Sequence, residues 1–215
     1  MSIPVFPPLS ERSGWGRIRE AIHGGGVLAL PLEYSWCMAQ SPLAVSRNGQ
    51  TPARSSLHQI KRRPSAKPFL YMAGSLSGIR PFAFLPSSVS SHVWIDAWPA
   101  FLTLILPAKP LAVSLGMSRF GGVAFRIPGD PLLRSFLSFL KTPVTGTSLN
   151  ISGSPPLVSM QEIQDVFPEL DGIVFSNEKD ASRISPVIDL SKGMPHVVRP
   201  GQGLFPICDL RYKKM

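Results

Sequence analysis

The stretch Ile60-Lys-Arg-Arg-Pro-Ser-Ala-Lys-Pro68 places four cations within seven residues, and two prolines stiffen it. Pro64 disfavours the helical conformation at Arg63 and favours an extended one. We therefore expect Lys61 and Arg63 to act as a pair and Arg62 to face elsewhere. Each charge-assisted contact from such a group to a phosphate is worth about 1.5–3 kcal/mol. The stretch predicts a phosphate-binding segment, and a solvated basic loop is the alternative. The four cations are Lys61, Arg62, Arg63 and Lys67.

A second polar stretch, Thr145-Gly-Thr-Ser-Leu-Asn-Ile-Ser-Gly153, lies far downstream. Ser148 and Asn150 are two residues apart at the end of an expected strand, so in an extended chain they point the same way. Their short side chains, with Ser152 and Gly153 beside them, leave room for a ligand close to the backbone. We expect the two stretches to meet and to hold the phosphates of a nucleotide, and a simple polar turn is the alternative.

The length, composition and net charge of the chain limit its possible folds and partners. A length of 215 residues suits one α/β domain with a real core, or two small ones, and a hydrophobic content of 44% excludes disorder throughout. The 23 prolines predict short elements and many fixed turns. A net charge of +9 favours anionic partners such as nucleotides, nucleic acid or acidic lipid headgroups, although it could serve solubility alone.

The sequence lacks the residue patterns that are typical of several kinds of functional site. The two cysteines, Cys37 and Cys208, form no ligand cluster, and the four histidines lack the spacing of zinc ligands. No Ser-His-Asp set and no pair of carboxylates stands out. No apolar run approaches the roughly 18 residues that span a bilayer, and the N-terminus lacks the pattern of a signal peptide. We therefore predict a cytoplasmic protein that does not use a membrane.

Helical and strand patterns alternate along the chain, which predicts an α/β class with a mixed sheet. Asp130-Pro131 is a strong helix start, and Ser159-Met-Gln-Glu162 has the form of a capping box. Residues 1–11 are expected to be an extended arm, 12–206 the domain and 207–215 a basic tail, with a long loop over 38–56. The expected helices cover residues 15–23, 55–60, 75–84, 88–98, 131–140 and 159–167. The expected strands cover residues 27–30, 69–72, 101–106, 122–128, 143–148, 172–175, 187–190 and 196–199.

The strand expected over residues 122–128 alternates cleanly. Val123, Phe125 and Ile127 share one face, and Ala124 and Arg126 share the other. Arg126 therefore either lines a site or covers the edge of the sheet.

An ordered set of segments between about residue 12 and residue 205 resembles the YrdC/YciO family, whose well-known members are threonylcarbamoyl-AMP synthases. Any one segment is weak evidence, whereas the set in this order is specific. The matching segments are Val27–Met38, Lys61–Arg63 with Lys67–Pro68, Trp98–Leu106, Val123–Pro128, Ser148–Gly153, Ser185–Leu190 and Arg199–Gly201.

The resemblance implies a twisted, mixed open sheet flanked by helices in one domain, with a concave basic face. It implies ATP and Mg²⁺ as cofactors and a reaction of L-threonine, bicarbonate and ATP to threonylcarbamoyl-AMP and pyrophosphate, which feeds tRNA modification. The family's signature tetrad, Lys-x-Arg plus Ser-x-Asn, is intact in this chain as Lys61, Arg63, Ser148 and Asn150. By resemblance, these four residues contact the ATP phosphates and the reacting carbamate. Arg199 would add a phosphate contact, and Ser185 a contact to the ligand.

One family segment is altered in this chain. The family has Pro-Thr-Asp/Glu-Thr-x-Tyr-Gly-Leu where this chain has Pro31-Leu-Glu-Tyr-Ser-Trp-Cys-Met38, so Leu32 and Tyr34 replace both threonines. By resemblance this segment helps to hold the amino acid. A polar substrate group left unpaired by Leu32 would cost about 1–3 kcal/mol, so the substrate is expected to be L-threonine or another small amino acid. The predicted substrate residues are Pro31, Leu32, Glu33, Tyr34, Trp36 and Lys67.

Two other readings stay open. The altered segment and the charge of +9 also suit a non-catalytic or altered-substrate paralogue that binds nucleotide and double-stranded RNA or tRNA. A carbamoyl-transfer module of the hydrogenase-maturation kind is less favoured, because the accompanying acylphosphatase-like and zinc-finger segments are missing from this sequence.

Overall fold

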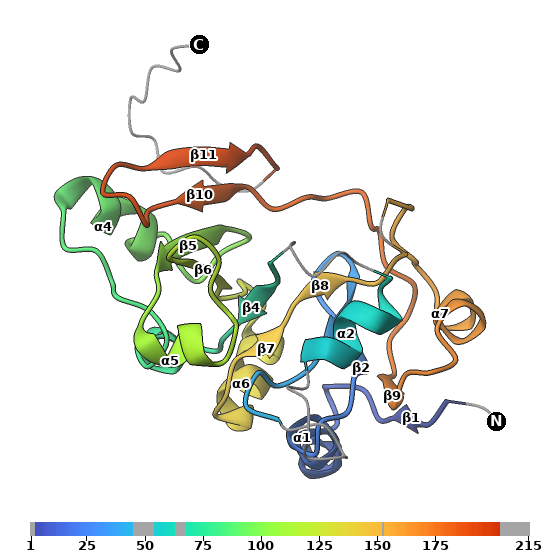
Figure 1. Ribbon diagram of the computed structural model, residues 1–215. Coiled ribbons are helices and arrows are strands. Elements are labelled where there is room, and N and C mark those ends of the chain that lie inside the picture. The colour runs from blue at the N-terminus through green and yellow to red at the C-terminus, as the bar shows by residue number, and fades with distance from the viewer. Residues whose placement is uncertain (1–2, 45–53, 63–67, 152, 203–215) are drawn as a thin grey trace.

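The computed structural model describes residues 3–44, 54–62, 68–151 and 153–202. It confirms the α/β class with mixed strand directions, and the strands are divided between two sheets rather than joined in one (Figure 1).

The first sheet has five strands in the order β1-β9-β2-β3-β8. Parallel pairing joins β1 to β9 and β9 to β2, and antiparallel pairing joins β2 to β3 and β3 to β8. These strands are β1 (Val5–Phe6), β2 (Leu28–Pro31), β3 (Trp36–Ala39), β8 (Thr147–Ser148) and β9 (Gly172–Val174).

The second sheet has six strands in the order β11-β10-β5-β6-β4-β7. The last two strands in sequence, β10 and β11, form an antiparallel pair, and β10 continues in parallel onto β5. These strands are β4 (Leu70–Met72), β5 (Thr103–Pro107), β6 (Gly122–Arg126), β7 (Val144–Thr145), β10 (Val187–Asp189) and β11 (His196–Arg199).

The helices are short, as the proline content predicts, and those expected over residues 75–84, 88–98 and 159–167 are shorter than expected. The helix predicted over residues 75–84 spans four residues, and α5 and β3 were not predicted at all. The helices are a 3₁₀ turn (Arg12–Gly14), α1 (Trp15–His23), α2 (Arg54–Ile60), α3 (Leu76–Ile79), α4 (Val89–Asp96), α5 (Pro110–Ser114), α6 (Pro131–Leu140) and α7 (Met160–Val166).

Both predicted helix starts are confirmed. The Asp130 carboxylate accepts a hydrogen bond from the backbone N–H of Leu133 at 2.6 Å, with Pro131 in the first helical turn of α6. At α7 the capping box is complete, because Ser159 and Glu162 accept from one another's backbone N–H groups.

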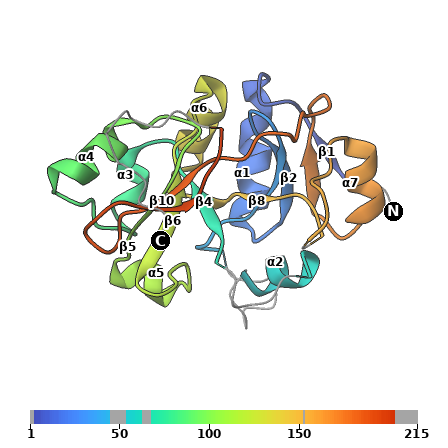
Figure 2. The same ribbon diagram turned by 90° about the horizontal axis from the view of Figure 1, so that it is seen from above.

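Strands β2 and β3 are buried on both faces, so each alternates between two cores. Ala29 and Met38 belong to the larger core, whereas Leu30 and Cys37 face the smaller one. Helices α1 and α6 lie side by side over the smaller core (Figure 2), where the Trp15 and Phe136 rings meet edge to face at 5.4 Å.

The strand predicted over residues 143–148 is split between the two sheets. Thr145 pairs with β4 in the second sheet, and Thr147 pairs with β3 in the first. Gly146 makes the crossing, and a Cβ there would lie 2.9 Å from the Met72 side chain. The polar stretch that begins at Thr145 therefore lies where the two sheets meet.

The segment predicted as an N-terminal arm is extended but tied to the body of the protein. Its strand β1 lies at the edge of the first sheet, and Ile3 and Leu9 are buried. The predicted basic tail and residues 45–53 of the predicted 38–56 loop lie outside the described residues, while residues 38–39 belong to β3. Within the described part of the chain, no helix has the length and apolarity needed to cross a membrane.

Candidate active site

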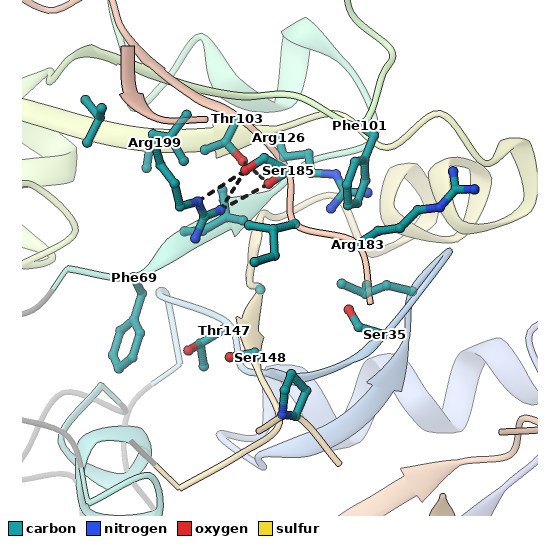
Figure 3. A pocket seen from close by; sticks show the side chains of 18 of the residues that line it. Ser35, Phe69, Phe101, Thr103, Arg126, Thr147, Ser148, Arg183, Ser185 and Arg199 are labelled. Carbon is teal, nitrogen blue, oxygen red and sulfur yellow. Dashed lines mark hydrogen bonds between the residues drawn. The ribbon is translucent and has the colours of Figure 1, made fainter. Parts of the chain in front are cut away.

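A cavity of about 560 Å³ opens between the two sheets. Thr147 and Ser148 of β8 form one wall, and Ser185, Arg199 and their neighbours form the opposite wall (Figure 3). The described residues that line the cavity include no Asp or Glu. Its positive potential and hydroxyl groups suit an anionic ligand. The cations and hydroxyls are Arg126, Arg183, Arg199, Ser35, Thr103, Thr147, Ser148 and Ser185.

Lys61 follows the C-terminus of α2 and is 1% exposed. Its ammonium donates to the Ser148 carbonyl, to the Asn150 carbonyl at 3.1 Å and to Asn150 Oδ1 at 2.6 Å. The structure thus brings the basic stretch against the polar stretch, as expected. An ammonium has three N–H donors, which matches the three contacts. Through them Lys61 fixes the backbone that carries Ser148, and Ser148 lines the cavity.

Side-chain bonds fix the same turn from the other side. The Ser148 hydroxyl donates to Asn150 Oδ1 at 2.8 Å, and Asn150 Nδ2 donates to the Ser154 carbonyl at 2.6 Å. Arg62 has a positive φ of 47° and is exposed, so it faces away as expected. The three other predicted residues of the two stretches, Arg63, Lys67 and Ser152, lie outside the described residues.

Arg199 and Ser185 meet on the opposite wall. Arg199 donates to the Ser185 carbonyl from Nε at 3.2 Å and from Nη2 at 2.9 Å, and the Ser185 and Thr103 hydroxyls are 3.2 Å apart. Burial lowers the pKa of Arg199, because desolvation disfavours its charged form. Gly201 keeps this wall close-packed, since a Cβ there would lie 2.3 Å from the Ile184 carbonyl oxygen.

Arg126 lines the cavity, which decides between the two roles that the sequence left open. Its Nη2 pairs with Glu33, and its Cζ lies 4.3 Å from the centroid of the Phe101 ring. Burial lowers the pKa of Arg126, and the charge of Glu33 opposes this shift. Glu33 also accepts from the Gly129 backbone N–H at 3.0 Å, so it joins Arg126 to the loop before α6.

The predicted substrate segment reaches the cavity at only some positions. Leu32 lines it, and Tyr34 meets Phe101 edge to face at 5.1 Å. Trp36 is instead a core residue, fully buried, whose Nε1 donates to the Val158 carbonyl at 3.0 Å. Pro31 and Glu33 line a neighbouring cavity of about 430 Å³.

Several lining residues were not predicted, among them Thr103, Phe101 and Arg183. Thr103 and Phe101 lie in the family-matching segment Trp98–Leu106, in which no residue was assigned a role, and the sequence around Arg183 carries no functional signal. Arg183 lies in the loop before β10, and its guanidinium is 4.4 Å from the centroid of the Tyr34 ring. Only the tertiary fold brings these residues together.

The described residues do not form a protein cage for Mg²⁺. Among the described residues no three His, Cys, Asp or Glu side chains cluster, and none of the described lining residues is a carboxylate. Magnesium usually keeps several waters and binds phosphates with few protein ligands, so its role here stays a prediction attached to the nucleotide.

The protein therefore has an α/β fold of two mixed sheets with a cavity lined by arginines and hydroxyl groups between them. A family model described as telomere recombination, covering Sua5, YciO and YrdC, matches residues 20–201. The chain therefore belongs to the Sua5/YciO/YrdC family, which confirms the resemblance seen in its segments.

Individual relatives agree with this assignment. A threonylcarbamoyl-AMP synthase of Cellvibrio japonicus is 28% identical over 177 residues, which cover 82% of this chain and 89% of that protein. Escherichia coli YciO has a TM-score of 0.76 at 23% identity, with 94% of this chain and 97% of that chain covered. P. abyssi Sua5, solved in complex with L-threonine, has a TM-score of 0.76 at 24% identity over 94% of this chain. This chain spans only 58% of that protein.

Proposed function

We propose that the protein is an ATP-dependent synthase of the threonylcarbamoyl-AMP type. The observation that carries the proposal is the cavity between the sheets, whose described lining has three arginines and five hydroxyl residues and no Asp or Glu. The curated relative from C. japonicus bears the name of this activity, and the P. abyssi relative was solved with L-threonine. The product would be consumed in modification of tRNA, and the cytoplasm is the expected location.

The proposed chemistry has two steps. The amine of L-threonine, or of another small amino acid, attacks bicarbonate to give a carbamate and water. A carbamate oxygen then attacks the α-phosphorus of ATP, and the bond to the bridging oxygen breaks, releasing pyrophosphate. The second step needs positioning and charge neutralisation more than a side-chain nucleophile, and the cavity offers these.

Residues on the two walls of the cavity have different proposed roles. Ser148 and Arg199, on opposite walls, are proposed to bind the phosphates, with Ser185 adding a contact to the ligand. Lys61 and Asn150 are proposed to hold Ser148 in place through the bonds described above. Arg63 is proposed as a further phosphate ligand and Lys67 as a substrate ligand.

Pyrophosphate release by the full chain tests the proposal. Release should require ATP, bicarbonate and an amino acid together, and omission of any one should abolish it. Arg199→Gln should lower kcat/KM for ATP about tenfold or more, the worth of one charge-assisted contact. Arg119→Gln is a matched control, because Arg119 lies over the exposed Phe120 ring and is absent from the cavity lining. No release with any proteinogenic amino acid, beside an active relative, would refute the proposal.

The net charge of +9 supports a second candidate, a paralogue that binds nucleotide and double-stranded RNA or tRNA. Its affinity for tRNA should fall linearly on a log–log plot against salt concentration, since phosphate contacts release counterions. Absence of binding at low salt would remove this candidate.

A further inference from the structure

A second cavity, of about 430 Å³, has no part in the proposed function. Leu32 lines both this cavity and the one between the sheets, so the two are neighbours. We call the second one the small cavity. Its volume lies within the range of about 300–1,000 Å³ that is common for sites of small molecules.

Three charged side chains line the small cavity, those of Glu33, Asp130 and Lys179. The Glu33 carboxylate is already occupied. One of its oxygens pairs with Arg126, and the other accepts from the backbone N–H groups of Gly129 at 3.0 Å and Asp130 at 3.4 Å. Asp130 and Lys179 are therefore the charges that remain for a ligand, and they have opposite signs.

The Asp130 carboxylate keeps one oxygen available. Its Oδ1 accepts from the Leu133 backbone N–H at 2.6 Å and caps α6. Its Oδ2 has no hydrogen-bond partner within the described chain. The side chain is half-buried on the cavity wall, so this oxygen can accept a charge-assisted hydrogen bond from a ligand.

Lys179 faces the two carboxylates without touching them. Burial lowers the pKa of Lys179, and the charges of Asp130 and Glu33 oppose this shift, so both lie close enough to act on its ammonium. Even so, Lys179 forms no salt bridge with either of them among the described residues. Opposite charges that line one cavity without meeting leave a gap, which a ligand with one charge of each sign can fill.

The rest of the small cavity is mostly apolar. Leu9, Leu132, Leu133 and Phe175 form its wall, and the Phe175 ring is 46% exposed. The Leu9 segment is fixed, because Trp15 Nε1 donates to the Leu9 carbonyl at 2.8 Å. A ligand side chain packed on this wall would remove apolar surface from water, which is favourable.

We propose that the small cavity is a second ligand site, which binds a free α-amino acid with an apolar side chain. The ammonium of this ligand contacts Asp130, its carboxylate contacts Lys179, and its side chain packs against Leu9 and Phe175. The site is separate from the reacting groups in the cavity between the sheets. The inference therefore goes beyond the proposed function and does not rest on it.

Calorimetric titration of the full chain with L-leucine, in the absence of ATP, tests this inference. L-Leucine should bind at one site. L-Leucinol, which lacks the carboxylate, and 4-methylpentanoate, which lacks the ammonium, should each bind about tenfold or more weakly, because each loses one charge-assisted contact. These two comparisons use the wild-type chain and do not depend on the folding of any variant.

Two variants locate the site. Lys179→Met and Asp130→Asn should each weaken L-leucine about tenfold. Asparagine retains a side-chain oxygen for the cap of α6, and urea unfolding checks that both variants fold. Lys192→Met is the matched control, because Lys192 is exposed and is absent from the described lining of both cavities. It should bind L-leucine as tightly as the wild type.

Three results would overturn the inference. One is the absence of L-leucine binding at millimolar concentrations. Another is binding of L-leucinol or 4-methylpentanoate as tight as that of L-leucine. The third is an L-leucine affinity that neither Lys179→Met nor Asp130→Asn changes, which would place the ligand elsewhere. None of these measurements uses ATP or bicarbonate, so each can fail while ATP-dependent pyrophosphate release still stands.

Discussion

Lys61 was predicted as a phosphate ligand, and in the structure its ammonium holds the turn that carries Ser148 and Asn150. Lys61→Met should remove a buried cation that serves three oxygens. We expect a loss of about 3 kcal/mol in the free energy of unfolding, because hydrogen bonds to a charged group are lost and buried acceptors are left unpaired. Affinity for ATP should fall about tenfold as Ser148 loses its fixed position. Urea unfolding and nucleotide titration measure the two effects.

Lys109→Met is the control for this change. Lys109 donates one hydrogen bond, to the Arg80 carbonyl at 2.7 Å, and lies outside the described lining of the cavity. Its loss should cost about 1 kcal/mol or less and leave ATP affinity unchanged. If Lys61→Met were as stable as wild type and had normal ATP affinity, the hydrogen bonds of the Lys61 ammonium would have no role in stability or in ATP binding.

Cys37 gives the protein a defined sensitivity to alkaline pH. The thiol is fully buried on β3, and desolvation raises its pKa to about 12. In the unfolded chain a cysteine ionises near pH 8.5. Between these two values the unfolded state loses the proton first, so the contribution of Cys37 to stability is present below about pH 8.5 and is lost as pH rises toward 12.

Urea unfolding at pH 8 and at pH 10 measures this effect in a Cys208→Ser background, which leaves Cys37 as the sole thiol. The stability advantage of this protein over the same protein with Cys37→Ala should shrink by about 2 kcal/mol between the two pH values. The cost of the cavity left by alanine is common to both pH values and cancels. A constant difference would show that the folded thiol titrates normally.

At the scale of elements, the wall that carries Arg199 depends on the close approach of two backbone segments. A Cβ at Gly201 would lie 2.3 Å from the Ile184 oxygen and 2.4 Å from the Pro186 nitrogen. Gly201→Ala should therefore push the segment after β11 away and weaken the bond from Gln202 N–H to the Ile184 carbonyl, now 3.0 Å. We expect a loss of about 1–3 kcal/mol in stability and weaker ATP binding, because Arg199 moves with this segment.

Gly16→Ala provides the contrast. Gly16 lies in α1, and a Cβ there meets nothing within 4 Å. This change should stabilise the protein by about 0.5–1 kcal/mol, because alanine favours helix. An equal loss of stability in both variants would mean that the close approach at Gly201 is unimportant.

The elements that the sequence predicted well are those with local signals. The caps at Asp130 and Ser159 and the amphipathic helix Trp15–His23 depend on residues close in sequence. Strand β3 was missed because its four residues are buried on both faces and show no alternation. The split of residues 143–148 at Gly146 was missed because only the close packing against Met72 marks it.

At the scale of the whole molecule, the candidate site was predictable in part. Lys61, Ser148 and Asn150 were paired from composition and from the family's order, and the structure brings them into contact. Arg183 carried no such signal, and Phe101 lay in a matching segment but was given no role, because both join the site only when the two sheets come together. The site is thus a property of the junction between the sheets, and no single motif contains it.

We propose that the cavity at this junction holds the nucleotide. A crystal structure of the full chain with a non-hydrolysable ATP analogue would test this proposal. We expect phosphate density between Ser148 on β8 and Arg199 on β11, within hydrogen-bond distance of both walls. An ATP analogue bound elsewhere on the molecule, with this cavity free of nucleotide density, would show that the cavity is not the nucleotide site.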